Sequence, residues 1–285
     1  MSATIDADAH IVEANKTFSR VLVGIDGTPE SFDAVRQAAQ LKAPGGVITC
    51  LAAWNLAFPV VTPLIASPSK EDEEREAREF AERAVRSAQA FIPSADVMLV
   101  HGSAGHALID AATRDRSTLV AVGSHGQLRT RGILLGSTAT RLLHDAPCSV
   151  LLARETTHLT PRRIIVGVDG SPESAAAYSV ARYLAGRFDG DVSVVVAEGK
   201  KLIDPAAVSL IVGDGFHVIP DEPVRVLTAA SADADLLVLG SRGLHGFKSL
   251  GSVSELVAHR AACSTLIVRS NDDAQRAEIR EESSR

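Results

Sequence analysis

Residues 20–40 read RVLVGIDGTPESFDAVRQAAQ, and residues 163–185 read RIIVGVDGSPESAAAYSVARYLA. Each stretch joins a short apolar run, a Gly-x-Asp-Gly turn, a Ser/Thr-Pro-Glu-Ser segment and an apolar-periodic segment. Thr28 is suited to the N-cap position and Pro29 to the first helical position, where its missing N–H costs nothing. Each stretch therefore predicts a buried strand that leads through a tight turn into a helix.

The repeat extends to the end of both copies. VGSHGQLRTRGILLGST at 122–138 matches LGSRGLHGFKSLGSVS at 239–254, and SVLLAR matches STLIVR. Asp26 and Asp169 lie 143 residues apart, but Gly123 and Gly240 lie only 117 apart, so the second copy is shorter in its middle. Such internal similarity indicates tandem domains. We expect a mobile tail at 1–17, a first domain at 18–154, a linker at 155–161, a shortened second domain at 162–269 and a charged tail at 270–285.

Strand and helix patterns alternate through both copies. Alternation of this kind predicts a parallel sheet with right-handed crossovers and helices on both faces. We expect two tandem doubly wound domains of the α/β class, each an open parallel five-stranded sheet, with the second abbreviated. One long helix is predicted over 71–91, and its periodicity places the following residues on the buried face: Ala77, Phe80, Ala81, Ala84, Ala88 and Phe91.

Composition narrows the class of protein. The net charge is −6 and no long Lys/Arg run occurs, which argues against nucleic acid as a partner. The first 20 residues lack the pattern of a signal peptide, and no run of about 18 apolar residues occurs, so we expect a cytoplasmic protein without a membrane partner. Cys50, Cys148 and Cys263 have no metal-ligand spacing and are expected to be buried small hydrophobes.

Both glycine motifs are placed at strand ends, where doubly wound sheets bind ligands. GIDG ends the first strand and GSHG ends the fourth. Asp26 can accept hydrogen bonds from ribose hydroxyls or a base amine, and glycines allow close approach of the backbone. The helix that follows Gly136 aims the N–H groups and hydroxyls of Ser137 and Thr138 at the same place, which suits an anion. Neither a Walker A lysine motif nor a dinucleotide GxGxxG follows a first strand.

The series Gly123-x2-Gly126-x9-Gly136-Ser137, downstream of a strand ending in Asp26, resembles the ATP-binding signature of the universal stress protein family. The resemblance covers residues 18–269, and the two copies together look like a tandem member. It implies ATP in each competent domain. The residues themselves indicate no catalytic group and no metal site. The residues that the resemblance implies for the first domain are Asp26, Gly27, Ala53, Val122, Gly123, His125, Gly126, Gly136, Ser137 and Thr138. Those for the second are Asp169, Gly170, Ala197, Gly240, Gly243, Gly251 and Ser252.

Several alternatives stay open at this point. Seven residues, rather than nine, separate Gly243 from Gly251, so the second loop either tightens around a shorter ligand or is degenerate. Arg129 and Arg131 either neutralise phosphates or are ordinary exposed loop residues. His106 and Asp110 share a helical face, but a metal site there is not expected.

The resulting hypothesis is a cytoplasmic, ATP-binding stress-response protein of regulatory type. It is expected to form a homodimer, or an intramolecular pseudo-dimer, through its terminal strands. The alternative is a weak ATPase or an adenylate-transferring enzyme, although no general base can be identified. The choice between ATP and cyclic AMP, and any role of Mg²⁺, stay open.

Overall fold

The computed structural model describes residues 18–55, 69–124, 135–156, 158, 160–199, 202–241 and 251–269. The elements of the first half are β1 (Arg20–Gly24), α2 (Pro29–Leu41), β2 (Val47–Trp54), α3 (Lys70–Phe91), β3 (Asp96–His101), α4 (Ala104–Arg114), β4 (Leu119–Gly123), α5 (Ser137–Asp145) and β5 (Ser149–Ala153). Those of the second half are β6 (Arg163–Gly167), α6 (Pro172–Phe188), β7 (Asp191–Ala197), α7 (Pro205–Val212), β8 (Val218–Ile219), α8 (Pro223–Ala230), the 3₁₀ turn η1 (Ser231–Asp233), β9 (Leu236–Gly240), α9 (Ser252–Arg260) and β10 (Ser264–Val268).

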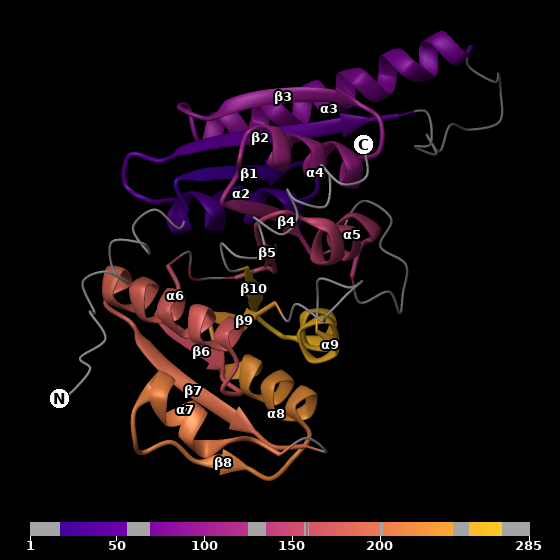
Figure 1. Cartoon of the computed structure of the whole chain (residues 1–285). Coiled ribbons are helices and arrows are strands. Elements are labelled where there is room, and N and C mark those ends of the chain that lie inside the picture. The colour runs from indigo at the N-terminus through magenta and orange to yellow at the C-terminus, as the bar shows by residue number, and fades with distance from the viewer. Residues whose placement is uncertain are drawn as a thin grey trace.

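The strands form one continuous sheet in the order β3-β2-β1-β4-β5-β10-β9-β6-β7-β8. Strand pairs within each half are parallel, whereas β5 and β10 pair antiparallel with Leu151 opposite Leu266. This pairing joins the halves within one chain, and Figure 1 shows them stacked on either side of it. The predicted α/β class, with two parallel units of which the second is abbreviated, is confirmed.

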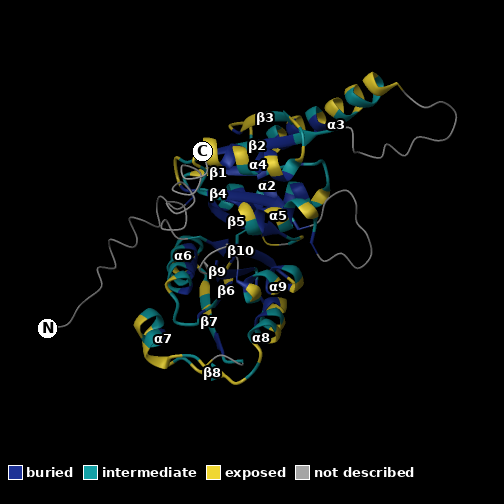
Figure 2. Ribbon diagram, turned by 45° about the vertical axis from the view of Figure 1, so that its right-hand side comes forward, coloured by how far each residue is buried: buried dark blue, intermediate teal, exposed yellow. Residues whose placement is uncertain are grey.

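Helices cover both faces of the sheet, as predicted. One core contains Val35 of α2 and Leu184 of α6, and also takes residues of α3 and α7. The other contains Leu108 of α4 and Leu142 of α5, together with residues of α8 and α9. Figure 2 shows the central strands buried and the exposed residues on the outer helices. Within the described ranges, no helix combines the length and the apolar run needed to span a bilayer.

The repeated strand-turn-helix segments form as predicted. Thr28 is the N-cap of α2, its hydroxyl accepts from the Ser31 N–H at 3.2 Å, and Pro29 is the first helical residue. Ser171 caps α6 in the same way by accepting from the Ser174 N–H at 3.2 Å. Two equivalent sequences therefore begin two equivalent helices by the same local hydrogen bond.

The predicted buried face of α3 is partly wrong. Ala81, Ala84 and Ala88 are buried, but Phe80 is 39% exposed and Phe91 is 56% exposed, while Val85 is buried in their stead. At 3.6 residues per turn, burial of Val85 rotates the apolar stripe so that both phenylalanines lie at its margin. Phe91 stacks beside Phe32 of α2, with ring centroids 5.7 Å apart.

Reciprocal arginines reinforce the junction between the halves. Arg154 follows β5 and donates through Nη2 to the carbonyls of Ala258 at 2.9 Å and His259 at 3.3 Å, near the end of α9. Arg269 follows β10 and donates to the carbonyl of Leu143 in α5 at 2.8 Å. Each arginine thus satisfies carbonyls that a helix end leaves without intrahelical partners.

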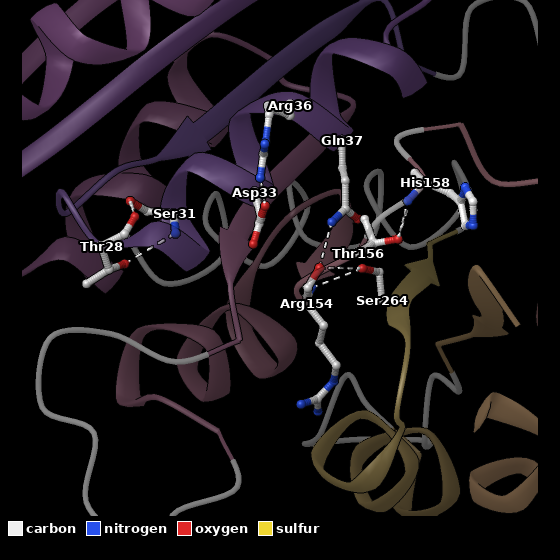
Figure 3. A network of polar contacts seen from close by, with 9 residues as sticks. All are labelled: Thr28, Ser31, Asp33, Arg36, Gln37, Arg154, Thr156, His158 and Ser264. Carbon is white, nitrogen blue, oxygen red and sulfur yellow. Dashed lines mark hydrogen bonds and ion pairs between the residues drawn. The ribbon is translucent and has the colours of Figure 1, made fainter. Parts of the chain in front are cut away.

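The backbone of Arg154 adds to this junction (Figure 3). Its N–H donates to the Ser264 hydroxyl at 3.0 Å, and its carbonyl accepts from the Gln37 amide at 2.8 Å. The residue therefore ties β5 to β10 and to α2.

We predict that Arg154→Ala destabilises the protein by about 2 kcal/mol, because it leaves partly buried carbonyls of α9 without a donor. The free energy of unfolding is measured by urea titration. Arg86→Ala is the matched control, since Arg86 lies on an exposed side of α3 and makes only an exposed ion pair with Glu82. Equal stability of the two variants would contradict a structural role for Arg154.

All three cysteines are buried and unpaired, as predicted. Burial raises the pKa of Cys50 to about 11, that of Cys148 to about 12 and that of Cys263 to about 11. Since the thiolate is the reactive form, these thiols are poor nucleophiles at neutral pH in the folded chain.

We predict that an aromatic disulfide reagent labels the native protein slowly at pH 8 and labels all three thiols at once after denaturation. The measurement is the absorbance of the released thiolate with time. Rapid labelling of the native protein at one equivalent would show that one cysteine is accessible after all.

Candidate functional site

The ends of β1 and β4 meet at one edge of the sheet. The two strands are direct neighbours, with Val23 opposite Ala121, so the residues that follow each strand emerge side by side. The Gly136 N–H donates to the Ser124 carbonyl at 2.9 Å, which holds the start of α5 against the end of β4. Asp26, Ser124 and the first turn of α5 therefore share this edge.

Asp26 has a defined place in the turn after β1. Its Oδ1 accepts from the Thr28 N–H at 3.1 Å and from the Thr28 hydroxyl at 2.6 Å, while Gly27 adopts φ +80°. The same turn recurs in the second half, where Asp169 Oδ1 accepts from Ser171 N–H at 3.1 Å and from its hydroxyl at 2.5 Å. Gly170 has φ +83°, a conformation that suits glycine.

Ala53 and Val122 lie on the same face of the sheet. Both pack with the core under α4 and α5, together with Leu51 and Val120 of their own strands. Alternation along a strand explains the grouping, since residues two apart share a face. Ala53 and Val122 therefore lie near the carboxyl ends of β2 and β4, on the face of the sheet that α4 and α5 cover. Ala197 takes the equivalent position at the end of β7.

The glycines that end β4 and β9 have a steric role in packing. A Cβ at Gly123 would lie 2.8 Å from the carbonyl carbon of Glu30, in the first turn of α2. A Cβ at Gly240 would lie 2.5 Å from the carbonyl oxygen of Glu173, in the first turn of α6. Close approach of a helix thus accounts for glycine at both positions, a reason that the sequence did not reveal.

We predict that Gly123→Ala destabilises the protein by about 1–3 kcal/mol, because α2 must move away from β4 to admit the methyl group. Gly186→Ala is the control, since a Cβ at this exposed position of α6 meets nothing within 4 Å and alanine favours a helix. Thermal unfolding of both variants is compared with that of the parent chain. A Gly123→Ala variant as stable as the parent would rule out tight packing at this point.

The starts of α5 and α9 differ in charge and polarity. Both helices have glycine at the N-cap, Gly136 and Gly251, with no side-chain hydrogen bond to the first turn. Ser137 and Thr138 follow Gly136, whereas Ser252 and Val253 follow Gly251, so the second helix lacks one hydroxyl. The first turn of α9 also contains Glu255, and that of α5 contains no acidic residue. The start of α5 is accordingly the more favourable for an anion.

Carboxylates also gather at the carboxyl edge of the second half. Glu198 follows β7 and accepts from the Ile203 N–H at 3.3 Å. A Cβ at Gly199 would lie 3.0 Å from Oε2 of Glu222, which shows how close the second carboxylate comes. Like charges repel, so this edge is less suited to a polyphosphate than its counterpart.

Two side-chain pairs at the first edge were not singled out from the sequence. Trp54, at the end of β2, lies opposite His101 at the end of β3, and their ring centroids are 4.5 Å apart. Arg141 of α5 contacts His106 of α4, with 2.6 Å between Nη1 and Nε2. The register that pairs Trp54 with His101 spans a 22-residue helix and could not be deduced from local patterns.

Some predicted site residues lie outside the described ranges: His125, Gly126, Arg129, Arg131 and Gly243. Among the residues that are described, no cluster of three or more His, Cys, Asp or Glu has the geometry to hold a metal ion. His106 and Asp110, one turn apart on α4, belong to this described part.

Comparison with known proteins identifies the class of protein. The model of the universal stress protein family matches residues 17–154 and 214–269. The universal stress protein Rv2623 of Mycobacterium tuberculosis is 29% identical over 87% of this chain and 96% of its own length, and a universal stress protein of Mycolicibacterium smegmatis is likewise 29% identical over the same shares.

Solved structures have the same fold. A universal stress protein from Archaeoglobus fulgidus superposes with a TM-score of 0.68 at 20% identity, covering 89% of this chain and 97% of its own. One from Pseudomonas aeruginosa also gives 0.68, at 17% identity, over 95% of this chain and all of its own. The chain belongs to the universal stress protein family, and it is a tandem member.

Proposed function

We propose that the protein is a cytoplasmic, ATP-binding member of this family with a regulatory role, and that its first half is the main nucleotide site. The observation that carries the proposal is the pairing of β1 with β4, together with the Gly136–Ser124 hydrogen bond. These two contacts bring a carboxylate, Asp26, and an uncapped helix start to one edge of the sheet. A nucleoside and its phosphates need such a combination of an acceptor and an anion site.

In this proposal each end of the nucleotide has its own partners. Asp26 accepts from the ribose or the base, and Ala53 and Val122 line the nucleoside. The N–H groups and hydroxyls of Ser137 and Thr138 bind phosphates, with Gly126 and Gly136 allowing the backbone to approach them. Mg²⁺ would accompany the phosphates, as it does with ATP in solution.

The second half is proposed as the weaker site. It retains Asp169, Ala197, Gly240, Gly251 and Ser252, but Val253, Glu255, Glu198 and Glu222 reduce its fitness for a polyphosphate. We treat 18–154 and 162–269 as two domains of an intramolecular pseudo-dimer, in which β5 and β10 occupy each other's edge.

Thermal unfolding with and without ATP and Mg²⁺ tests this proposal. At a hundredfold excess over the Kd, ATP should stabilise the folded chain by about 2.7 kcal/mol and raise its Tm. Asp26→Asn should remove most of the rise. Asp169→Asn changes the equivalent turn in the second half and should keep most of it, so it controls for the loss of turn hydrogen bonds.

The outcomes distinguish the candidate functions. An unchanged Tm of the parent chain would overturn the proposal, and equal losses in both variants would overturn the assignment of the main site to the first half. Sustained release of ADP or AMP beyond one equivalent would favour the alternative of a weak ATPase or adenylate-transferring enzyme. Mass spectrometry of the ligand that copurifies would separate ATP from cyclic AMP.

A further inference from the structure

Arg141 is held in an unusual way on the exposed side of α5. Its Nη1 lies 2.6 Å from Nε2 of His106, in the first turn of α4. A guanidinium can only donate, so Nε2 of His106 is the acceptor in this contact. The imidazole therefore orients Arg141 without supplying a carboxylate that would cancel its charge.

The path of the Arg141 side chain depends on Gly105. A Cβ at Gly105 would lie 2.6 Å from Cδ of Arg141 and 3.4 Å from its Cγ. The aliphatic part of the arginine thus crosses the first turn of α4 where no side chain obstructs it. By this path the guanidinium reaches Nε2 of His106.

The charge of Arg141 has no carboxylate partner within the described part of the chain. Many of the other arginines there are paired with acidic groups: Arg36, Arg75, Arg78, Arg83, Arg86, Arg114, Arg163 and Arg225. Arg141 instead has one imidazole acceptor and several N–H groups left over. Such a group is suited to bind an external anion.

Arg141 also lies close to the proposed phosphate site. It is four residues after Ser137, so both side chains are on one side of α5 and one turn apart. Long side chains on a helix lean toward its N-terminus, which directs Arg141 toward the turn of Ser137. His106 lies in the first turn of α4, shortly after the carboxyl end of β3 and so at the same edge of the sheet.

The matched position in the second half, which the structure describes, has no such charge. The residue equivalent to Arg141 is Leu256, in α9, which is 43% exposed. The two halves therefore differ by a full positive charge at matched positions of matched helices.

We propose that Arg141 determines which nucleotides the first half prefers, by binding the distal phosphates, and that His106 is its positioning residue. The inference rests on the proposed function and assigns a nucleoside di- or triphosphate, rather than a monophosphate, as the preferred ligand class. Charge-assisted, forked hydrogen bonds from a guanidinium suit phosphate oxygens, and each added phosphate supplies more of them.

Calorimetric titration of the full chain with ATP, ADP and AMP tests this assignment. Arg141→Leu, which copies Leu256, should weaken ATP binding about tenfold while AMP binding changes less than about twofold. Arg86→Leu removes one charge from α3 and should leave the ATP-to-AMP affinity ratio unchanged. Arg141→Lys keeps the charge without the fork and should retain part of the preference.

His106 is tested by the same ratio. His106→Gln supplies an amide oxygen that can accept from Arg141 and should preserve the preference, whereas His106→Leu should reduce it. If His106 only bridges α4 and α5, His106→Leu should lower thermal stability and weaken the binding of ATP, ADP and AMP to the same extent.

The failures of the two proposals are distinguishable. If the parent chain binds none of the nucleotides, the proposed function is wrong and this inference falls with it. If the parent chain binds ATP and Arg141→Leu binds it equally well, only the role of Arg141 is wrong. The same conclusion follows if Arg141→Leu loses affinity for ATP, ADP and AMP by the same factor.

Discussion

The antiparallel pairing of β5 with β10 is the contact on which the rest of the architecture depends. Every residue of both strands is buried, from Ser149 to Ala153 and from Ser264 to Val268. A parallel sheet needs cover on both faces and protection at its edges. β5 and β10 would each be an exposed edge strand in an isolated half. By pairing with each other they become the two central strands of one ten-stranded sheet.

The outer edges of the sheet show how far the second half has been reduced. α3 buries Ala81, Ala84, Val85 and Ala88 against the first half, whereas α7 buries only Val208. Leu210 of α7 is 77% exposed in consequence, and Ile211 and Val212 are only partly buried. The loss of sequence in the second copy therefore removed cover from its outer strands and left intact the central strands that bind the first half.

Local patterns in the sequence were sufficient to predict most of the fold. The repeat, the N-caps and the alternation of strands and helices depend on neighbouring residues, and these predictions agree with the structure. The rotation of α3 could not be predicted, because Phe80, Phe91 and Val85 are all apolar and only the position of β2 and β3 decides which of them is covered. The spacing of Gly123, Gly136 and Ser137 carried the resemblance to the family, and the match of the family model established the membership.

The candidate site was less accessible to sequence reasoning. Asp26 and the start of α5 were predicted to meet because strand order in doubly wound sheets follows a rule. The contacts of Gly123 with Glu30 and of Arg141 with His106 follow from how helices approach one another and the sheet, and no local pattern encodes them. A residue can therefore be recognised in sequence as part of a motif while its steric reason emerges only in three dimensions.

The hydrogen bond from Arg269 gives α5 a second role. Its first turn belongs to the candidate site, and near its other end the carbonyl of Leu143 is bonded to Arg269 from beyond β10. A helix of nine residues is short and stiff, about 14 Å from end to end, so its two ends move together. A displacement of α5 would therefore move the candidate site and the Leu143 carbonyl at the junction together. One short helix is thus shared by the candidate site and by the junction between the two halves.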